Sequence, residues 1–99
     1  MDLNSKKLGR FEYFYSEFLL EGVPSDAESR ILDAINRCTS LTAEQKNVMI
    51  CRYIKADTWR NIAEENGITV EKARIRVDQA FRKLKHPRWN TRTVLKNNI

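Results

Sequence analysis

The sequence predicts a small all-α domain of five to six helices that contains a helix-turn-helix. The 99 residues include only 3 glycines and 2 prolines, which are the residues that interrupt helices most strongly. Apolar residues recur at spacings of three and four, and residues suited to helix capping precede most of these periodic segments. We expect one domain over 1–99, with an N-terminal helical pair (1–40), a helix-turn-helix segment (41–87) and a basic C-terminal tail (88–99).

An aromatic helix is predicted first, over residues 7–20. Its large apolar residues fall at i, i+3, i+4, i+7 and i+8 and so share one helical face: Phe11, Phe14, Tyr15, Phe18 and Leu19. Because a small domain has few other large side chains to bury, we expect this face to cover the domain's own core. The alternative is a docking face, including one that forms a homodimer.

Capping patterns predict two further helices. Ser25 with Glu28 has the spacing of a capping box, and Thr42 with Gln45 has the same spacing. The apolar face of the helix after Ser25 consists of Ile31, Leu32, Ile35 and Cys38. The helix after Thr42 extends to residue 54, and its apolar positions, which include Val48, Met49, Cys51 and Ile54, are dense enough for a central helix.

Three residues that begin or end helices predict the helix-turn-helix. Thr58 can cap a helix over 59–66. Gly67 follows directly, and glycine just past a helix end is the usual residue for the left-handed backbone that reverses a chain tightly. Thr69 can then cap a long helix over 70–85.

The long helix has one apolar side. Its predicted inward stripe consists of Val70, Ala73, Val77, Ala80 or Phe81, and Leu84. Pro87 ends the helix, because proline cannot donate a backbone hydrogen bond and disfavours helical geometry in the residue before it. Asn90 can cap one last turn that contains Val94 and Leu95.

The charge of the chain is unevenly distributed. The formal net charge is +5, but residues 1–50 hold 6 Lys and Arg against 8 Asp and Glu, whereas residues 51–99 hold 12 against 5. Between Lys72 and Lys96 there are nine basic residues and one acid, Asp78. This bias is too strong for ordinary surface solvation and predicts nucleic-acid binding, and the helix-turn-helix favours double-stranded DNA.

Several classes of protein are disfavoured. No run approaches the roughly 20 apolar residues that span a bilayer, and no signal peptide is recognisable, so we expect a cytoplasmic protein without a membrane partner. Cys38 and Cys51 lack metal-site spacing and His86 is the only histidine, so we expect reduced core thiols and no metal or cofactor. No nucleophile motif, phosphate loop or paired acids at an obvious cleft favours an enzyme.

The polar side of the long helix supplies the candidate DNA-binding residues. Residues near the start of a recognition helix reach base edges, where arginine pairs with guanine and an apolar group contacts a thymine methyl. The base-proximal candidates are Glu71, Lys72, Arg74 and Ile75, with Gln79 at the margin. The phosphate-contacting candidates are Arg60, Arg82, Lys83, Lys85, Arg88 and Arg92.

The segment 41–87 resembles region 4 of the bacterial sigma-70 family, the domain that reads the upstream promoter hexamer. The resemblance lies in LTAEQKNVMICRYIKAD at 41–57, TWRNIAEENGIT at 58–69 and AFRKLKHP at 80–87, of which the last is the most specific. It implies that Val70, Glu71, Arg74 and Ile75 sit at the DNA groove. It also implies that the segment 41–54 packs against the recognition unit and helps to present it to the RNA polymerase flap.

Three positions differ from the family pattern. Ile75 stands where housekeeping sigma factors usually carry a base-reading glutamine, and Val70 stands where they usually carry arginine. These differences speak against recognition of the consensus hexamer. Arg76 occupies a usually apolar position, which predicts a slightly rotated helix that buries Val77 instead.

Two hypotheses for function follow. The first is a DNA-binding transcription regulator that acts with RNA polymerase. The second is a protein-interaction module that mimics sigma region 4 and binds RNA polymerase or an anti-sigma factor, through 41–54 or the aromatic helix, with little DNA affinity. No part of the chain resembles the sigma segment that binds the polymerase clamp, so we expect a small stand-alone regulator. The DNA target, and activation or repression, are not encoded in any recognisable pattern.

Overall fold

The structure, a computed structural model, describes residues 9–96. Over this range the chain is all-helical, and no strand occurs. The elements are α1 (Arg10–Ser16), α2 (Ala27–Arg37), α3 (Ala43–Tyr53), α4 (Trp59–Asn66), α5 (Val70–Leu84), the short 3-10 helix η2 (Pro87–Trp89) and α6 (Thr91–Lys96). The all-α prediction is therefore confirmed. None of the described helices is long and apolar enough to cross a membrane.

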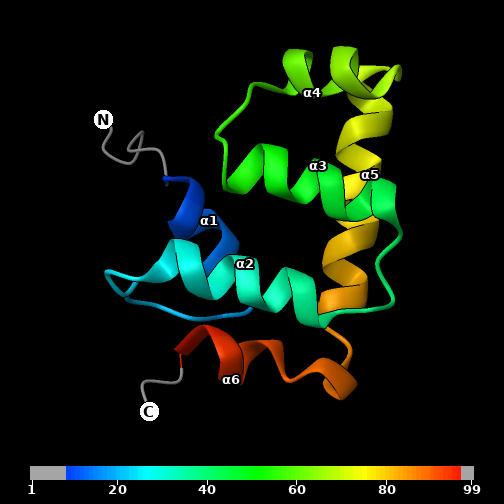
Figure 1. The fold of residues 1–99 in the computed structure, drawn as a ribbon. Coiled ribbons are helices and arrows are strands. Elements are labelled where there is room, and N and C mark those ends of the chain that lie inside the picture. Colours follow the sequence, from blue (N-terminus) through cyan, green and yellow to red (C-terminus); the bar gives the residue numbers. More distant parts are fainter. Residues whose placement is uncertain (1–8, 97–99) are drawn as a thin grey trace.

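The long helix α5 is the axis on which the other elements are arranged (Figure 1). Helix α3 packs across α5, and α4 packs beside the N-terminal half of α5. Helix α2 packs against α3 on one side and against α6 on the other, so that α4 and α6 lie at opposite ends of the molecule. This arrangement leaves one long side of α5 without a neighbouring helix.

An aromatic cluster joins α1 to the helix-turn-helix segment. The ring of Phe14 lies 5.2 Å from that of Tyr53 on α3 and 5.1 Å from that of Phe81 on α5, measured between ring centres. Phe18 completes the cluster at 5.6 Å from Phe14 and 6.0 Å from Phe81. All four side chains are buried. The aromatic face therefore covers the chain's own core, as predicted, and these rings are not free to form a homodimer.

The aromatic helix is shorter than predicted. Helix α1 ends at Ser16, whose hydroxyl donates to the carbonyl of Tyr13 at 2.7 Å, and the chain then turns. Leu19 has a left-handed φ of 59° and is 86% exposed, so its predicted place on the buried face is wrong. The helical periodicity stops before this residue, which is why the spacing rule fails there. Residues 7 and 8 lie outside the described range.

The two predicted capping boxes have different outcomes. Thr42 Oγ1 accepts from the backbone N–H of Gln45 at 3.0 Å, and Gln45 Oε1 accepts from that of Thr42 at 3.0 Å, so this box is confirmed. The box at Ser25 is wrong. Helix α2 begins one residue later, after Asp26, and no side chain caps it. The carboxylate of Asp26 instead accepts from Arg30 Nε at 2.7 Å.

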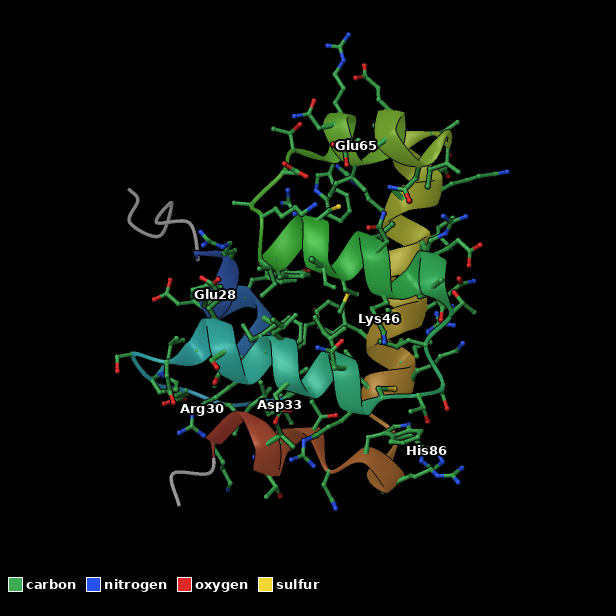
Figure 2. All side chains as sticks on the ribbon, in the orientation of Figure 1. Glu28, Arg30, Asp33, Lys46, Glu65 and His86 are labelled. Atoms are coloured by element: carbon green, nitrogen blue, oxygen red, sulfur yellow. The ribbon has the colours of Figure 1, made fainter. Side chains whose placement is uncertain are left out.

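Residues 88–96 of the predicted basic C-terminal segment pack against the core. Leu95 is fully buried, and its carbonyl accepts a 2.7 Å hydrogen bond from the hydroxyl of Tyr15. The hydroxyl of Thr91 donates to the carbonyl of Leu84 at 2.6 Å, which ties α6 to the end of α5. Figure 2 shows Arg30 and Asp33 where α2 faces α6, and Arg30 Nη1 lies 3.5 Å from the carbonyl of Val94.

Candidate nucleic-acid interface

Both helices of the bihelical unit begin at a threonine cap, as the sequence predicts. Thr58 Oγ1 accepts from the backbone N–H of Asn61 at 3.1 Å at the start of α4. Thr69 Oγ1 accepts from that of Lys72 at 3.1 Å at the start of α5. Each cap satisfies a backbone donor that has no partner within its helix. The two helix starts are therefore determined locally.

The corner between α4 and α5 is a glycine turn. Gly67 has a left-handed φ of 63°, which glycine adopts without the steric cost of a Cβ. The backbone N–H of Ile68 donates to the carbonyl of Ala63 at 3.0 Å, and that of Gly67 donates to Glu64 at 3.3 Å. This pair of bonds is the Schellman arrangement that closes a helix end. The predicted helix-turn-helix corner is confirmed.

Helix α5 has a buried side and an exposed side. The buried side consists of Ala73, Val77, Ala80, Phe81 and Leu84, as predicted. Successive residues are turned by about 100° around a helix, so the residue two positions after Ala73 points away from the core. We call the exposed residues on this side the outer stripe: Glu71, Ile75, Asp78, Gln79 and Arg82. The outer stripe is the part of α5 best placed to enter a groove.

Two apolar residues near the start of α5 are exposed. Ile75 is 48% exposed in the middle of the outer stripe. Val70 is 37% exposed, so its predicted place in the inward stripe is wrong. The buried stripe of α5 therefore begins only at Ala73. The exposure of Val70 is compatible with the position at the DNA groove that the family resemblance implies for it.

Arg74 and Lys72 lie on opposite flanks of α5, because they are the two neighbours of the inward-facing Ala73. Both are exposed. The guanidinium carbon of Arg74 lies 5.5 Å from the ring centre of Trp59, which is the first residue of α4. Arg74 therefore reaches outward from the side of α5, and the Trp59 ring helps to hold its orientation.

Three of the predicted phosphate-contacting residues have partners within the chain. Lys83 Nζ donates to the carbonyl of Ser40 at 2.9 Å and to Gln45 Oε1 at 2.8 Å. Lys85 pairs with Glu17 at 2.8 Å. Arg92 Nε donates to the carbonyl of Phe18 at 2.9 Å. A phosphate would compete with these partners, so we expect these three residues to contribute less to DNA affinity than their charge suggests.

The other three predicted phosphate-contacting residues form weaker contacts, or none, within the described chain. Arg60 and Glu64 form a long, exposed pair at 3.7 Å on α4. The guanidinium carbon of Arg88 lies 5.3 Å from the ring centre of Trp89. Arg82 forms no ion pair or side-chain hydrogen bond within residues 9–96 and belongs to the outer stripe. The structure thus brings Arg82, but not Arg88, together with the base-proximal candidates.

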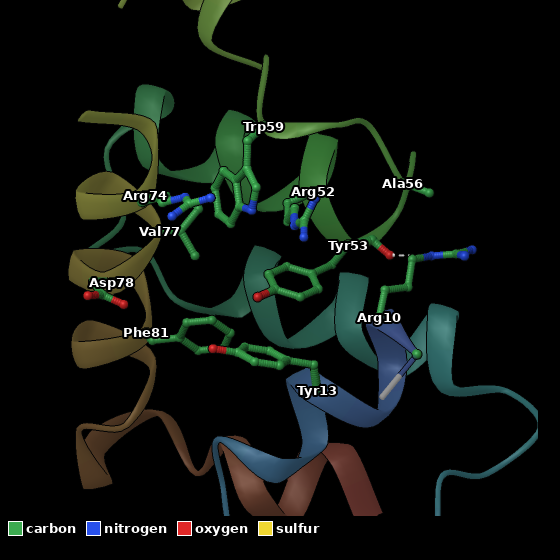
Figure 3. Close-up of a pocket in the computed structure, with 11 residues that line it drawn as sticks. Arg10, Tyr13, Arg52, Tyr53, Ala56, Trp59, Arg74, Val77, Asp78 and Phe81 are labelled. Atoms are coloured by element: carbon green, nitrogen blue, oxygen red, sulfur yellow. Dashed lines mark hydrogen bonds between the residues drawn. The ribbon is translucent and has the colours of Figure 1, made fainter. Parts of the chain in front are cut away.

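A stacked group beside α5 was not foreseen from the sequence. Arg52 on α3 lies with its guanidinium carbon 4.3 Å from the ring centre of Trp59, and in Figure 3 Arg52 and Arg74 lie on either side of this indole. Arg52 Nη1 also donates to the carbonyl of Asp57 at 3.2 Å. No sequence signal predicts this group, because it depends on the angle at which α3 crosses α5.

The buried cysteines are free thiols, and burial raises the pKa of both. The ligand atoms of Cys51, Asp57 and Glu65 lie within 4.8 Å of one another, a grouping that the spacing of the residues does not reveal. The thiol of Cys51 lies 3.8 Å from Glu65 Oε1. The Cys51 thiol donates to this carboxylate oxygen, and the weak hydrogen bond at the junction of α3 and α4 accounts for the proximity of Cys51 and Glu65.

The comparisons with known proteins agree with the geometry. The family model described as "Sigma-70, region 4" matches residues 39–86, which include α3, the glycine corner and the whole of α5. Neither the curated proteins nor the solved structures contain a significant match to the chain. Domains of this family are DNA-binding helix-turn-helix domains. Residues 39–86 are therefore a sigma-70 region 4-like helix-turn-helix domain.

Proposed function

We propose that the protein is a transcription regulator that binds double-stranded DNA through the outer stripe of α5 and acts with RNA polymerase. The observation that carries the proposal is the division of α5 into two sides. One side is locked into the core, while the outer stripe is exposed and follows a closed helix-turn-helix corner. A helix held in this way can enter a major groove without any rearrangement of the domain.

The proposed contacts fall into two classes. Val70, Glu71 and Ile75 lie near the start of α5 and would face base edges, with Lys72, Arg74 and Gln79 beside them. The exposed Ile75 suits a thymine methyl group. Arg82 and Arg60 would contact phosphates first, because they are less engaged within the chain than Lys83 and Lys85.

Selection of a cognate duplex from random DNA, followed by fluorescence anisotropy with variants, tests this proposal. Arg74→Ala should weaken binding to the selected duplex by about 1–3 kcal/mol and should affect random DNA less. Arg82→Ala should weaken binding to both duplexes about equally and make the salt dependence shallower. Equal losses on both duplexes for both variants, or no selectable duplex, would contradict sequence-specific recognition.

A protein-interaction module is the second candidate. It is favoured by the internal partners of Lys83, Lys85 and Arg92, which reduce the free charge available to DNA, and by the exposed apolar residues Val70 and Ile75. A pull-down with core RNA polymerase after nuclease treatment separates the two candidates. Retention that survives Arg74→Ala and Arg82→Ala, without measurable DNA affinity, would favour the interaction module.

A further inference from the structure

A pocket of about 570 Å³ lies on the flank of α5 that carries Arg74. Residues of α1, α3, α4 and α5 border it, so it includes a helix that lies outside the family-matching segment. Figure 3 shows its interior between the Trp59 group and the rings of Tyr13 and Phe81. Pockets of roughly 300–1,000 Å³ are typical of small-molecule sites. The size of this pocket therefore suits an organic ligand and exceeds the need of a single ion.

The polar groups of the pocket favour an anion. Arg52 and Arg74 stand at one wall on either side of Trp59 (Figure 3). Asp78 is the only acidic residue among those that line the pocket. Arginine is the side chain best suited to phosphate and carboxylate, because its planar group donates several hydrogen bonds in a fixed geometry.

Tyr53 provides an independent indication of a ligand. Its side chain is only 3% exposed, and its hydroxyl has no hydrogen-bond partner within residues 9–96. Figure 3 shows this hydroxyl directed into the pocket. A tyrosine hydroxyl is protonated at neutral pH and so can donate, and burial raises the pKa of Tyr53 further. A buried donor without a partner is costly, and an anionic oxygen in the pocket would satisfy it.

The aromatic walls favour a ligand with a planar ring. Trp59 lies on one side of the pocket, and Tyr13 and Phe81 lie on the other. We infer that the pocket binds a free nucleoside phosphate, whose phosphate oxygens accept from Arg52, Arg74 and Tyr53 and whose base packs against the exposed ring of Tyr13. A base within a duplex is stacked and paired, so duplex DNA could offer only a phosphate to the rim of the pocket.

Occupancy of the pocket would regulate DNA binding, and this part of the inference rests on the proposed function. Arg74 is both a proposed DNA contact and a lining residue of the pocket. A nucleotide that holds Arg74 competes with DNA for the same guanidinium. Because such coupling is reciprocal, DNA should weaken nucleotide binding by the same factor.

Isothermal titration calorimetry of the whole chain with the four ribonucleoside triphosphates tests the binding. We expect saturable binding of at least one of them at a single site. Tyr53→Phe and Arg52→Gln should each weaken it by about tenfold or more, because each removes a hydrogen bond to a charged group. Arg82→Gln is the matched control, since it removes the same charge from the outer stripe and should change nucleotide affinity less than twofold.

Tyr53→Phe keeps the aromatic ring, and thermal melting checks that each variant is folded. Absence of saturable binding at millimolar nucleotide, or equal affinity in Tyr53→Phe and the unaltered chain, would overturn the inference. Inorganic triphosphate should bind at least tenfold more weakly than the best nucleotide. Equal affinity for the two ligands would show that the rings play no part and would also overturn it.

Anisotropy of a labelled duplex, with and without excess nucleotide, tests the regulation. We expect nucleotide to weaken DNA binding by the unaltered chain but not by Tyr53→Phe. A DNA affinity that is the same with and without bound nucleotide would overturn only the regulatory part of the inference. Nucleotide binding without any DNA affinity would refute the proposed function and leave the pocket assignment intact. DNA binding without nucleotide binding would refute the pocket assignment and leave the proposed function intact.

Discussion

The segment 39–86 and the helices that flank it contribute differently to this molecule. The family-matching segment contains the glycine corner and the outer stripe, and so contains the proposed DNA-binding chemistry. The flanking elements α1, α2 and α6 contribute mainly buried surface, through the ring of Phe14 and the side chains of Ile31 and Leu95. The difference teaches that the residues that present a functional helix can lie outside the segment that a family defines.

The largest expected effect comes from removing the flanks altogether. A peptide spanning 39–86 should be mostly unfolded, because Phe81 would lose the rings of Phe14 and Phe18 that pack against it. Far-ultraviolet circular dichroism and thermal melting measure this. A cooperative melting transition of the peptide would show that the flanks are dispensable and would remove the basis of the comparison.

Truncation of one flanking ring gives a smaller effect. Phe14→Ala should destabilise the protein by about 3–5 kcal/mol in urea unfolding, because it leaves a cavity between Tyr53 and Phe81. Tyr13→Ala is the control from the same helix. Tyr13 is 46% exposed, so its removal should cost much less. Similar losses for the two variants would mean that α1 is not anchored through its buried side.

Removal of a single hydroxyl tests the contact between α1 and α6. Tyr15→Phe removes the donor to the buried carbonyl of Leu95 and should cost about 1–3 kcal/mol of unfolding free energy. Ser16→Ala is a control, since it removes an exposed hydroxyl bond in the same helix. A loss for Ser16→Ala as large as that for Tyr15→Phe would contradict the assignment of α6 to the core.

The smallest expected effects concern backbone conformation at the boundaries of α4. Gly67→Ala should cost about 1–2 kcal/mol, because alanine is strained at the left-handed φ of 63° although no atom lies within 4 Å of the added Cβ. Ala56→Gly should have the opposite sign, since Ala56 has a φ of 61°. Urea unfolding of both variants measures this. A stabilising Gly67→Ala would contradict the strained corner.

Local patterns were sufficient for much of the helix-turn-helix. Thr58, Gly67 and Thr69 act on backbone groups within three or four residues, so their roles are visible in the sequence alone. The same rule failed at Ser25, because Asp26 lies beside it and pairs with Arg30. A local rule is reliable only where no nearby competitor exists.

Assignment of the basic residues required the tertiary structure. In the sequence Lys83 and Arg82 are equivalent neighbours, yet Lys83 is bonded to Ser40 and Gln45 while Arg82 belongs to the outer stripe. The partners of Lys83 lie 43 and 38 residues away in the sequence and reach it only when α3 packs against α5. The charge of the sequence therefore overstated the number of basic side chains that have no partner within the described chain and can contact DNA.

The sequence by itself determined the helical fold class, the three threonine caps, the glycine corner and the buried side of α5 from Ala73 onward, because these follow from interactions within one or two helical turns. Only the tertiary structure decided that the C-terminal segment joins the core and that Arg52, Trp59 and Arg74 form one wall of a pocket. These features depend on the angles between helices, which arise from the packing of side chains distant in the chain.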